Sequence, residues 1–351
     1  MTLYLNRLVR LVLLLSVMVG LVACKPNPLD DIALFQSFIT ENINKKSDDP
    51  YISSTVKPGD KMYDILVNIQ HGRHDSASNK LQAMIEENDI DAMVWYAKLI
   101  YRASINNRPK ALSLYQTAME DDNPYAYIML SPGLISSGCA RYFGEKNCTQ
   151  EHFNRAIELF KPLAAQGDLR AQYFLLKQQE LEQSKETRAQ YIQEVVRFSQ
   201  AHYYQPLMDY VNTILIYSPS KGKSEAKTPE QYQLAIQLLT IAANNNYIPA
   251  LKRRLEVDVD EETFNQFMEQ LTRLGSTFEI YENYFNSLDE YERYYYSMLF
   301  KRLTGDNKLS SSYTPTDEEL SVISEKIEKT INSMSPMVYI DGFTSRDDWV
   351  D

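Results

Sequence analysis

Apolar and small residues recur along the middle of the chain at the spacing of an amphipathic helix, and short polar segments interrupt them. Residues 156–176 show this pattern most clearly. Ile157 and Phe160 fall on one helical face, a turn follows at Gly167, and a second apolar run begins at Ala171. Apolar residues at this period predict helices, and the polar break predicts a turn. We therefore expect two short antiparallel helices here.

The same arrangement occurs five times between residues 77 and 258, and each copy places two small or apolar residues fifteen positions apart. Successive copies begin 34 to 45 residues apart, which is typical of stacked helix pairs. Such pairs bury their apolar faces only against their neighbours, so the pattern predicts an all-α solenoid. The paired positions are Ala77 and Ala92, Ala111 and Ala126, Ala156 and Ala171, Ile192 and Leu207, and Ala235 and Ala250.

Other segments surround and interrupt these pairs. Residues 24–76 are expected to hold a spacer and N-terminal helices, and residues 259–335 to form capping helices, one of them unbroken over 278–303. The polar segment 218–229 and the insertion that carries two cysteines are expected to project as exposed loops. The tail takes residues 336–351. Its part from 341 to 351 carries Phe343 and Trp349 among charged residues and is expected to be flexible, with docking as a candidate role.

The third and fifth copies resemble the Sel-1-like repeat, a relative of the tetratricopeptide repeat. The residues that carry the likeness are Ala156, Leu159, Ala164, Gly167, Asp168 and Ala171, and again Ala235, Leu238, Ala242, Ala243 and Ala250. Only the third copy has the turn glycine, and the other four replace it with Asn88, Asp122, Tyr203 and Asn246. The resemblance implies a right-handed α-α solenoid of about five helix pairs that binds another protein on its concave face.

The N-terminus has the features of a secretory signal. Arg7 and Arg10 precede an apolar run over residues 11–22, which is too short to span a bilayer. The run ends in Leu21-Val22-Ala23-Cys24, which resembles the lipobox of bacterial lipoproteins. The resemblance implies removal of residues 1–23, acylation of Cys24, and lodging in the outer membrane facing the periplasm. A plain signal peptide with an incidental cysteine is the alternative.

The remaining cysteines, Cys139 and Cys148, lie nine residues apart in a glycine-containing insertion. In an oxidising compartment this spacing favours a disulfide that closes the insertion. A metal site lacks a second pair of ligands, and a thiol-redox site would normally have a C-x-x-C motif.

The net charge of −11 disfavours nucleic acid as a partner and suits a basic partner or simple solubility. Three consecutive tyrosines, Tyr294, Tyr295 and Tyr296, cannot all face one core, and we treat them as a candidate interface. His71 and His74 form the only histidine cluster, which lacks an evident third metal ligand. No catalytic or cofactor motif is present, so no cofactor and no metal are expected.

Together these features predict a membrane-anchored periplasmic scaffold or adaptor that binds another protein and is not an enzyme. Three alternatives stay open within the binding and structural classes: an immunity lipoprotein that neutralises a periplasmic lipase toxin, a scaffold for exopolysaccharide secretion, and a structural envelope component. An envelope hydrolase that uses the histidines or cysteines is the alternative from another class, although no motif supports it.

Overall fold

The structure, a computed structural model, describes residues 27–132 and 138–350, so the signal segment and Cys24 lie outside the described residues. The described chain is mostly helical, which confirms an all-α fold; it contains 17 α-helices and one two-stranded β-hairpin. The helices are α2 (Asp31–Asn42), α3 (Tyr63–Gln70), α4 (His74–Glu86), α5 (Ile90–Ile100), α6 (Arg108–Glu120), α7 (Pro124–Met129), α8 (Cys139–Phe143), α9 (Gln150–Ala165), α10 (Leu169–Lys177), α11 (Arg188–Gln200), α12 (Gln205–Ile214), α13 (Pro229–Asn244), α14 (Ile248–Leu255), α15 (Glu261–Arg273), α16 (Phe278–Asn286), α17 (Glu290–Thr304) and α18 (Asp317–Ser333).

Each of the five fifteen-residue spacings falls on a helical hairpin: α4 with α5, α6 with α7, α9 with α10, α11 with α12, and α13 with α14. The eight paired alanines are completely buried, as expected where small side chains let two helices approach closely. In the fourth hairpin the larger Ile192 and Leu207 take these places and are also buried. The alanine spacing therefore marks the contact line of each hairpin.

One turn geometry joins the two helices of every hairpin. A residue with positive φ ends the first helix, at Asn88, Asp122, Gly167, His202 and Asn246. In the third hairpin, Gly167 N–H donates to Ala164 O and Asp168 N–H donates to Leu163 O, the pair of bonds that defines a Schellman motif. The same pair of bonds recurs in the other four turns.

The turn residue predicted for the fourth hairpin, Tyr203, is wrong by one position. His202 holds the positive φ, because α11 ends with bonds from His202 N–H to Ser199 O and from Tyr203 N–H to Phe198 O. Two further turns of this kind occur outside the predicted repeats, at Gly72 between α3 and α4 and at Gly275 between α15 and α16. The hairpin architecture thus continues into the segment that was expected only to cap it.

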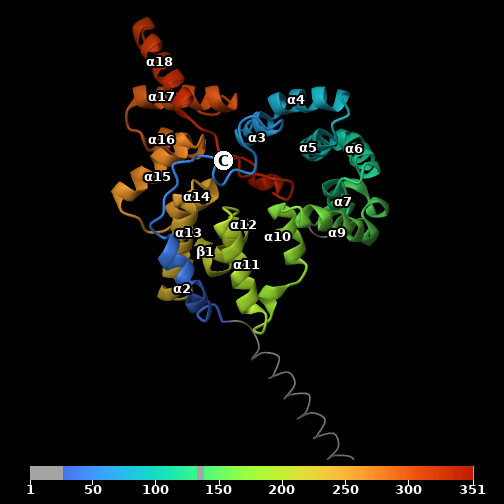
Figure 1. The fold of residues 1–351 in the computed structure, drawn as a ribbon. Coiled ribbons are helices and arrows are strands. Elements are labelled where there is room, and N and C mark those ends of the chain that lie inside the picture. The colour runs from blue at the N-terminus through green and yellow to red at the C-terminus, as the bar shows by residue number, and fades with distance from the viewer. Residues whose placement is uncertain (1–26, 133–137, 351) are drawn as a thin grey trace, which may run out of the picture.

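The hairpins follow one another around a closed ring (Figure 1). The two ends of the stack meet where buried His71 Nε2 lies 2.7 Å from Gly275 O, which joins the turn after α3 to the turn after α15. Helix α2 packs on α11 and α13, and its buried Asp31 pairs with Arg188 at 2.6 Å and accepts a bond from Tyr210. The chain then crosses to α3 through residues 43–62, so N-terminal segments help to close the ring.

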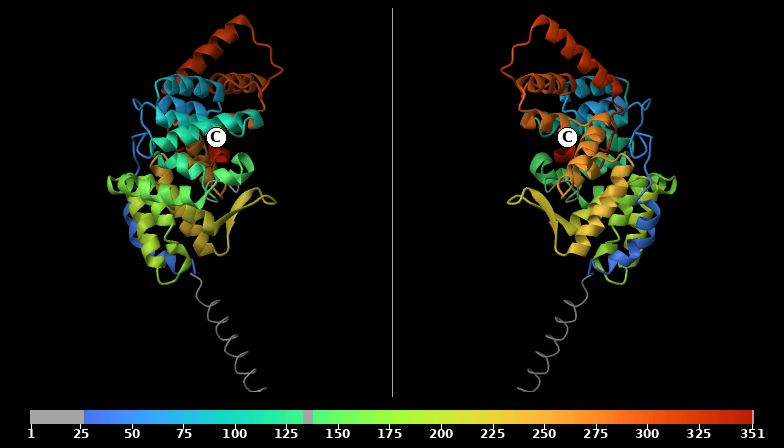
Figure 2. Two further views of the ribbon diagram at one scale, coloured as in Figure 1. Left: turned by 90° about the vertical axis from the view of Figure 1, so that its right-hand side faces the viewer. Right: turned by 90° about the vertical axis from the view of Figure 1, so that its left-hand side faces the viewer.

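Two expectations about connecting segments are wrong, and a third is correct only in part. The helix predicted over 278–303 breaks at residues 287–289, because Asp289 caps a new helix through Tyr291 N–H. The segment 218–229 projects from the body as expected, but part of it forms an antiparallel hairpin of β1 (Leu215–Ser218) and β2 (Lys223–Ala226) (Figure 2). In the described part of the cysteine insertion, α8 packs Phe143 against Tyr101 and Tyr115 and is not an exposed loop.

Asn246 gives a direct test of how the ring is closed. Its side-chain amide donates to Ser47 O and Asp49 O and accepts from Gln270 and Arg273, whereas the equivalent Asn88 is an exposed turn residue. Glycine keeps the positive φ but removes these bonds. We expect Asn246→Gly to lower the free energy of unfolding in urea by about 3 kcal/mol, and the control Asn88→Gly by less than about 0.5 kcal/mol. Equal effects would contradict this role.

Candidate binding cavity

The C-terminal tail crosses the centre of the ring, so the prediction that it is flexible is wrong (Figure 1). We call residues 335–350 the strap. Met337 N–H donates to Leu274 O at 3.0 Å, and Val338 O accepts from Thr55 N–H at 2.8 Å. Met337, Val338, Ile340 and Trp349 are fully buried, because they cover apolar side chains on the inner wall of the ring.

Lys98 holds the strap in place with its buried side chain. Its side chain is only 2% exposed, and its ammonium lies 5.0 Å from the Trp95 ring and 5.5 Å from the Trp349 ring. The ammonium donates to Gly342 O at 2.8 Å and to Thr344 O at 3.4 Å. Burial lowers the pKa of Lys98 to about 8, and nearby Asp341 opposes that shift. Two tryptophan rings and two carbonyls thus hold a buried charge against the strap.

Phe343 anchors the middle of the strap. Its ring stacks on Phe174 with 5.2 Å between centroids and also packs against Phe160 and Tyr125. Gly342 precedes it because an added Cβ would lie 2.3 Å from the Tyr125 ring. The strap therefore fits closely against α7, α9 and α10.

A cavity of about 680 Å³ opens between the strap and the inner helices α10, α12 and α14. Aromatic side chains form much of its wall: Tyr173, Phe174, Tyr203, Tyr339 and Phe343. Its carboxylates are Asp209, Glu256, Asp341, Asp347 and Asp348, and its cations are Lys177, Lys252 and Arg253. This volume is in the range of small-molecule and peptide side-chain sites.

Two tyrosine–carboxylate pairs set the polarity of the cavity. Tyr173 donates to Asp209 Oδ2 at 2.6 Å, and Tyr203 donates to Asp341 Oδ2 at 3.3 Å. Burial and the adjacent carboxylates raise the pKa of both tyrosines, so both hydroxyls stay protonated. Burial and the neighbouring Asp347 also raise the pKa of Asp348, while Lys252 opposes the rise. None of these residues was predicted as a site residue. Tyr203 was expected only at a turn, and the strap that completes the cavity carries no helical period.

The candidate interface Tyr294–Tyr296 lies in a separate small core formed by α16, α17 and α18. Tyr295 is buried and its hydroxyl lies 2.9 Å from Thr330 Oγ1, while Tyr294 and Tyr296 are half-buried. Three exposed apolar side chains, including the most exposed large apolar one of the described residues, lie instead at the corner between α16 and α17. Leu288 is 94% exposed, beside Phe285 at 57% and Tyr281 at 37%.

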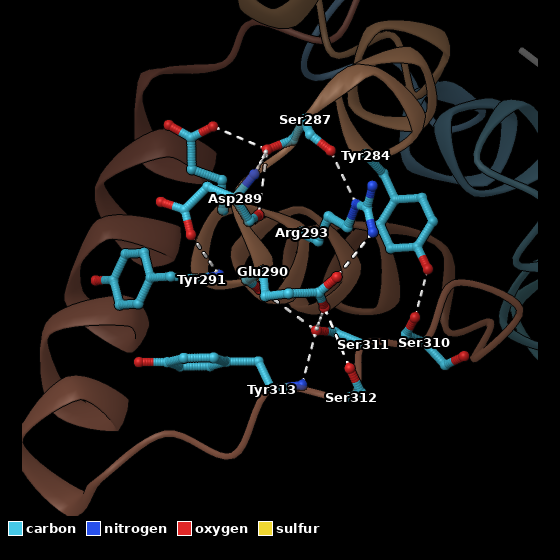
Figure 3. A network of polar contacts seen from close by, with 11 residues as sticks. Tyr284, Ser287, Asp289, Glu290, Tyr291, Arg293, Ser310, Ser311, Ser312 and Tyr313 are labelled. Atoms are coloured by element: carbon cyan, nitrogen blue, oxygen red, sulfur yellow. Dashed lines mark hydrogen bonds and ion pairs between the residues drawn. The ribbon is translucent and has the colours of Figure 1, made fainter.

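A polar network holds this corner in one shape (Figure 3). Arg293 donates to Ser287 O at 2.9 Å and pairs with Glu290 at 2.8 Å. Ser311 and Ser312 bond to Glu290, and Tyr284 bonds to Ser310 O, which attaches the segment before α18 to the start of α17. We call Tyr281, Phe285 and Leu288 the apolar corner; its backbone is fixed although its side chains face solvent.

The other predicted residues have structural positions. Cys139 and Cys148 form a disulfide with Cα atoms 5.9 Å apart, next to α8. His71 joins the two ends of the ring, and His74 starts α4, where burial lowers its pKa. Within residues 27–132 and 138–350 no group of three or more His, Cys, Asp or Glu side chains could hold a metal ion. Among the helices of the same residues, none is long and apolar enough to cross a membrane.

No protein-family model matches this chain, and no sequence among curated proteins is similar to it.

The depressed pKa of Lys98 predicts how stability changes with pH. The unfolded lysine titrates near 10.5 and the folded one near 8, so between these values the unfolded chain binds more protons. The contribution of Lys98 to stability should therefore rise through this window, by roughly 2 kcal/mol between pH 8 and 10. Tyrosines whose pKa is raised by burial, such as Tyr173 and Tyr203, act in the opposite direction, because the unfolded tyrosines ionise near pH 10. The Lys98 contribution is therefore measured as the difference between the wild type and Lys98→Met in urea unfolding at both pH values. An equal change with pH in both proteins would show that Lys98 is not responsible.

Proposed function

We propose that the protein is a rigid protein-binding scaffold of a bacterial cell envelope, built from Sel-1-like helix pairs in a right-handed solenoid and anchored by lipid on Cys24. The observation that carries the binding function is the apolar corner. A leucine that is 94% exposed on a loop fixed by hydrogen bonds is a preformed anchor for a partner.

The geometry favours the apolar corner over the concave face as the partner's docking surface. The strap already covers the inner wall of the ring with four fully buried apolar residues. At the corner, Tyr281 and Phe285 pack together with 4.8 Å between ring centroids, and Leu288 extends the same surface. Aromatic and aliphatic anchors of this kind supply most of the free energy of a typical protein interface.

A paired substitution tests the docking surface. We expect Leu288→Asp to weaken binding of the proteins that the wild type retains from membrane and periplasmic extracts of its own host by about 30-fold, as for loss of a central anchor. Ile105 is 68% exposed in the loop between α5 and α6, so Ile105→Asp is the matched control and should leave binding unchanged. Quantitative affinity capture measures both. Retention of the same proteins by the Leu288 variant would rule out the corner.

A separate substitution tests the lipid anchor. If Cys24 carries the lipid, Cys24→Ser should move the protein from the membrane to the soluble fraction and abolish labelling by radioactive palmitate. Cys139→Ser, in the disulfide, is the matched cysteine control and should leave both readouts unchanged. Membrane retention of the Cys24 variant would contradict lipid anchoring without affecting the docking proposal.

A further inference from the structure

We propose that the cavity between the strap and helices α10, α12 and α14 binds an alkylammonium group, either of a free amine or of a lysine side chain in a peptide. This site is separate from the apolar corner and does not depend on the function proposed above.

Aromatic rings form much of the cavity wall. Phe174 and Phe343 stack on each other with an angle of 6° between ring planes, and Tyr173 meets Tyr203 edge to face with 6.2 Å between centroids. The face of an aromatic ring carries the negative part of its quadrupole and attracts ammonium groups. Both tyrosine hydroxyls already donate to carboxylates, so neither proton is available to repel a bound cation.

The lining also carries an excess of negative charge, with five carboxylates and three cations. Asp341 is the most informative of them, because it is only 6% exposed. Its carboxylate accepts bonds from Phe343 N–H, Thr344 N–H, Thr344 Oγ1 and the Tyr203 hydroxyl, all of them neutral donors. Lys98 and Arg170 lie near it, but Lys98 donates to strap carbonyls and Arg170 pairs with Asp168. A buried carboxylate without a directly bonded cation favours a cationic ligand.

The cations of the lining are engaged with other groups. Arg253 pairs with Glu256 and donates to Leu215 O at 2.6 Å. The ammonium of Lys252 lies over the Phe278 ring, 5.3 Å from its centroid. Glu256 and Asp209, the partners of Arg253 and Lys177, belong to the five lining carboxylates. Asp347 pairs with Arg102 and Lys252 acts on Asp348, so Asp341 is the carboxylate left for a ligand.

Lys177 shows how an ammonium is accommodated at the edge of this cavity. Its Nζ lies 5.5 Å from the centre of the Tyr173 ring and 3.5 Å from Asp209 Oδ2. Its side chain is more than half exposed, so it stays at the rim. A ligand ammonium placed deeper, between the aromatic walls and Asp341, would make the same two kinds of contact with less competition from water.

Isothermal titration with matched probes tests the site. Choline is compared with its neutral isostere 3,3-dimethylbutan-1-ol, and an end-blocked Gly-Lys-Gly peptide with an end-blocked Gly-norleucine-Gly peptide. We expect at least one cation to bind at least 10-fold more tightly than its neutral partner. Binding of choline alone identifies a small-molecule amine as the source of the group, and binding of the lysine peptide alone identifies a peptide.

Variants locate the binding. Asp341→Asn removes the charge and keeps an oxygen that can accept from Phe343 N–H and Thr344 N–H, and it should weaken cation binding about 10-fold. A fall in melting temperature would show that Asp341→Asn loosens the strap. In that case the affinity of Asp209→Asn for the cation tests whether a lining carboxylate contributes to binding. Asp64→Asn, at an exposed residue outside the cavity that pairs with Lys80, is the control and should change affinity less than 2-fold. Equal binding of charged and neutral probes, no cation binding at 10 mM, or unchanged affinity in both the Asp341 and Asp209 variants would overturn the proposal.

Discussion

A closed ring of helical hairpins has an apolar inner wall, and the structure depends on keeping that wall out of water. The strap does this with four fully buried apolar side chains, and the ring holds it through backbone bonds at Leu274 and Thr55. The buried Lys98 ammonium adds a contact that only the correct placement satisfies, because its partners are two carbonyls and two tryptophan rings. A misplaced strap would leave a buried charge without partners, which costs far more than a lost apolar contact. Lys98 therefore helps to specify where the strap lies.

The hairpins could be predicted because their signals are local. Alanines fifteen residues apart fix where two helices cross, and a polar residue able to adopt positive φ fixes the turn. The error at Tyr203 is of the same local kind, since His202 can also adopt that φ and the pattern was off by one residue. The break before α17 had a signal too: Asp289 is a good N-cap, but the aromatic residues on both sides continued the helical period across it. The hydrophobic period therefore identifies the buried face of a helix more reliably than it identifies where the helix ends.

The strap and the cavity could not be predicted in this way. Residues 335–350 have neither the helical period nor a strand alternation long enough to interpret, and their apolar residues are spaced to match side chains from several helices. Because those helices are far away in sequence, only the folded ring defines the match. The cavity could not be predicted for the same reason, since Tyr173 and Tyr203 lie on predicted hairpins while Asp341 and Phe343 come from the strap. Leu288 was missed for a related reason: a leucine in an apolar helical stripe is expected to be buried, and the broken helix exposes it.

The free energy that holds the strap in the ring also affects where a partner can bind. Burial of a large apolar side chain contributes about 1.5–3 kcal/mol, so four such residues hold the strap with roughly 6–12 kcal/mol before the entropy of ordering it is subtracted. A partner that used the inner wall would have to replace these contacts before it gained any affinity of its own. The apolar corner requires no such exchange, because its side chains already face solvent on a fixed backbone. The cavity also requires none, because it is open while the strap is in place. A ring filled by its own tail is thus better suited to recognition at its corner and beside the strap than along the concave face that helical repeats usually offer.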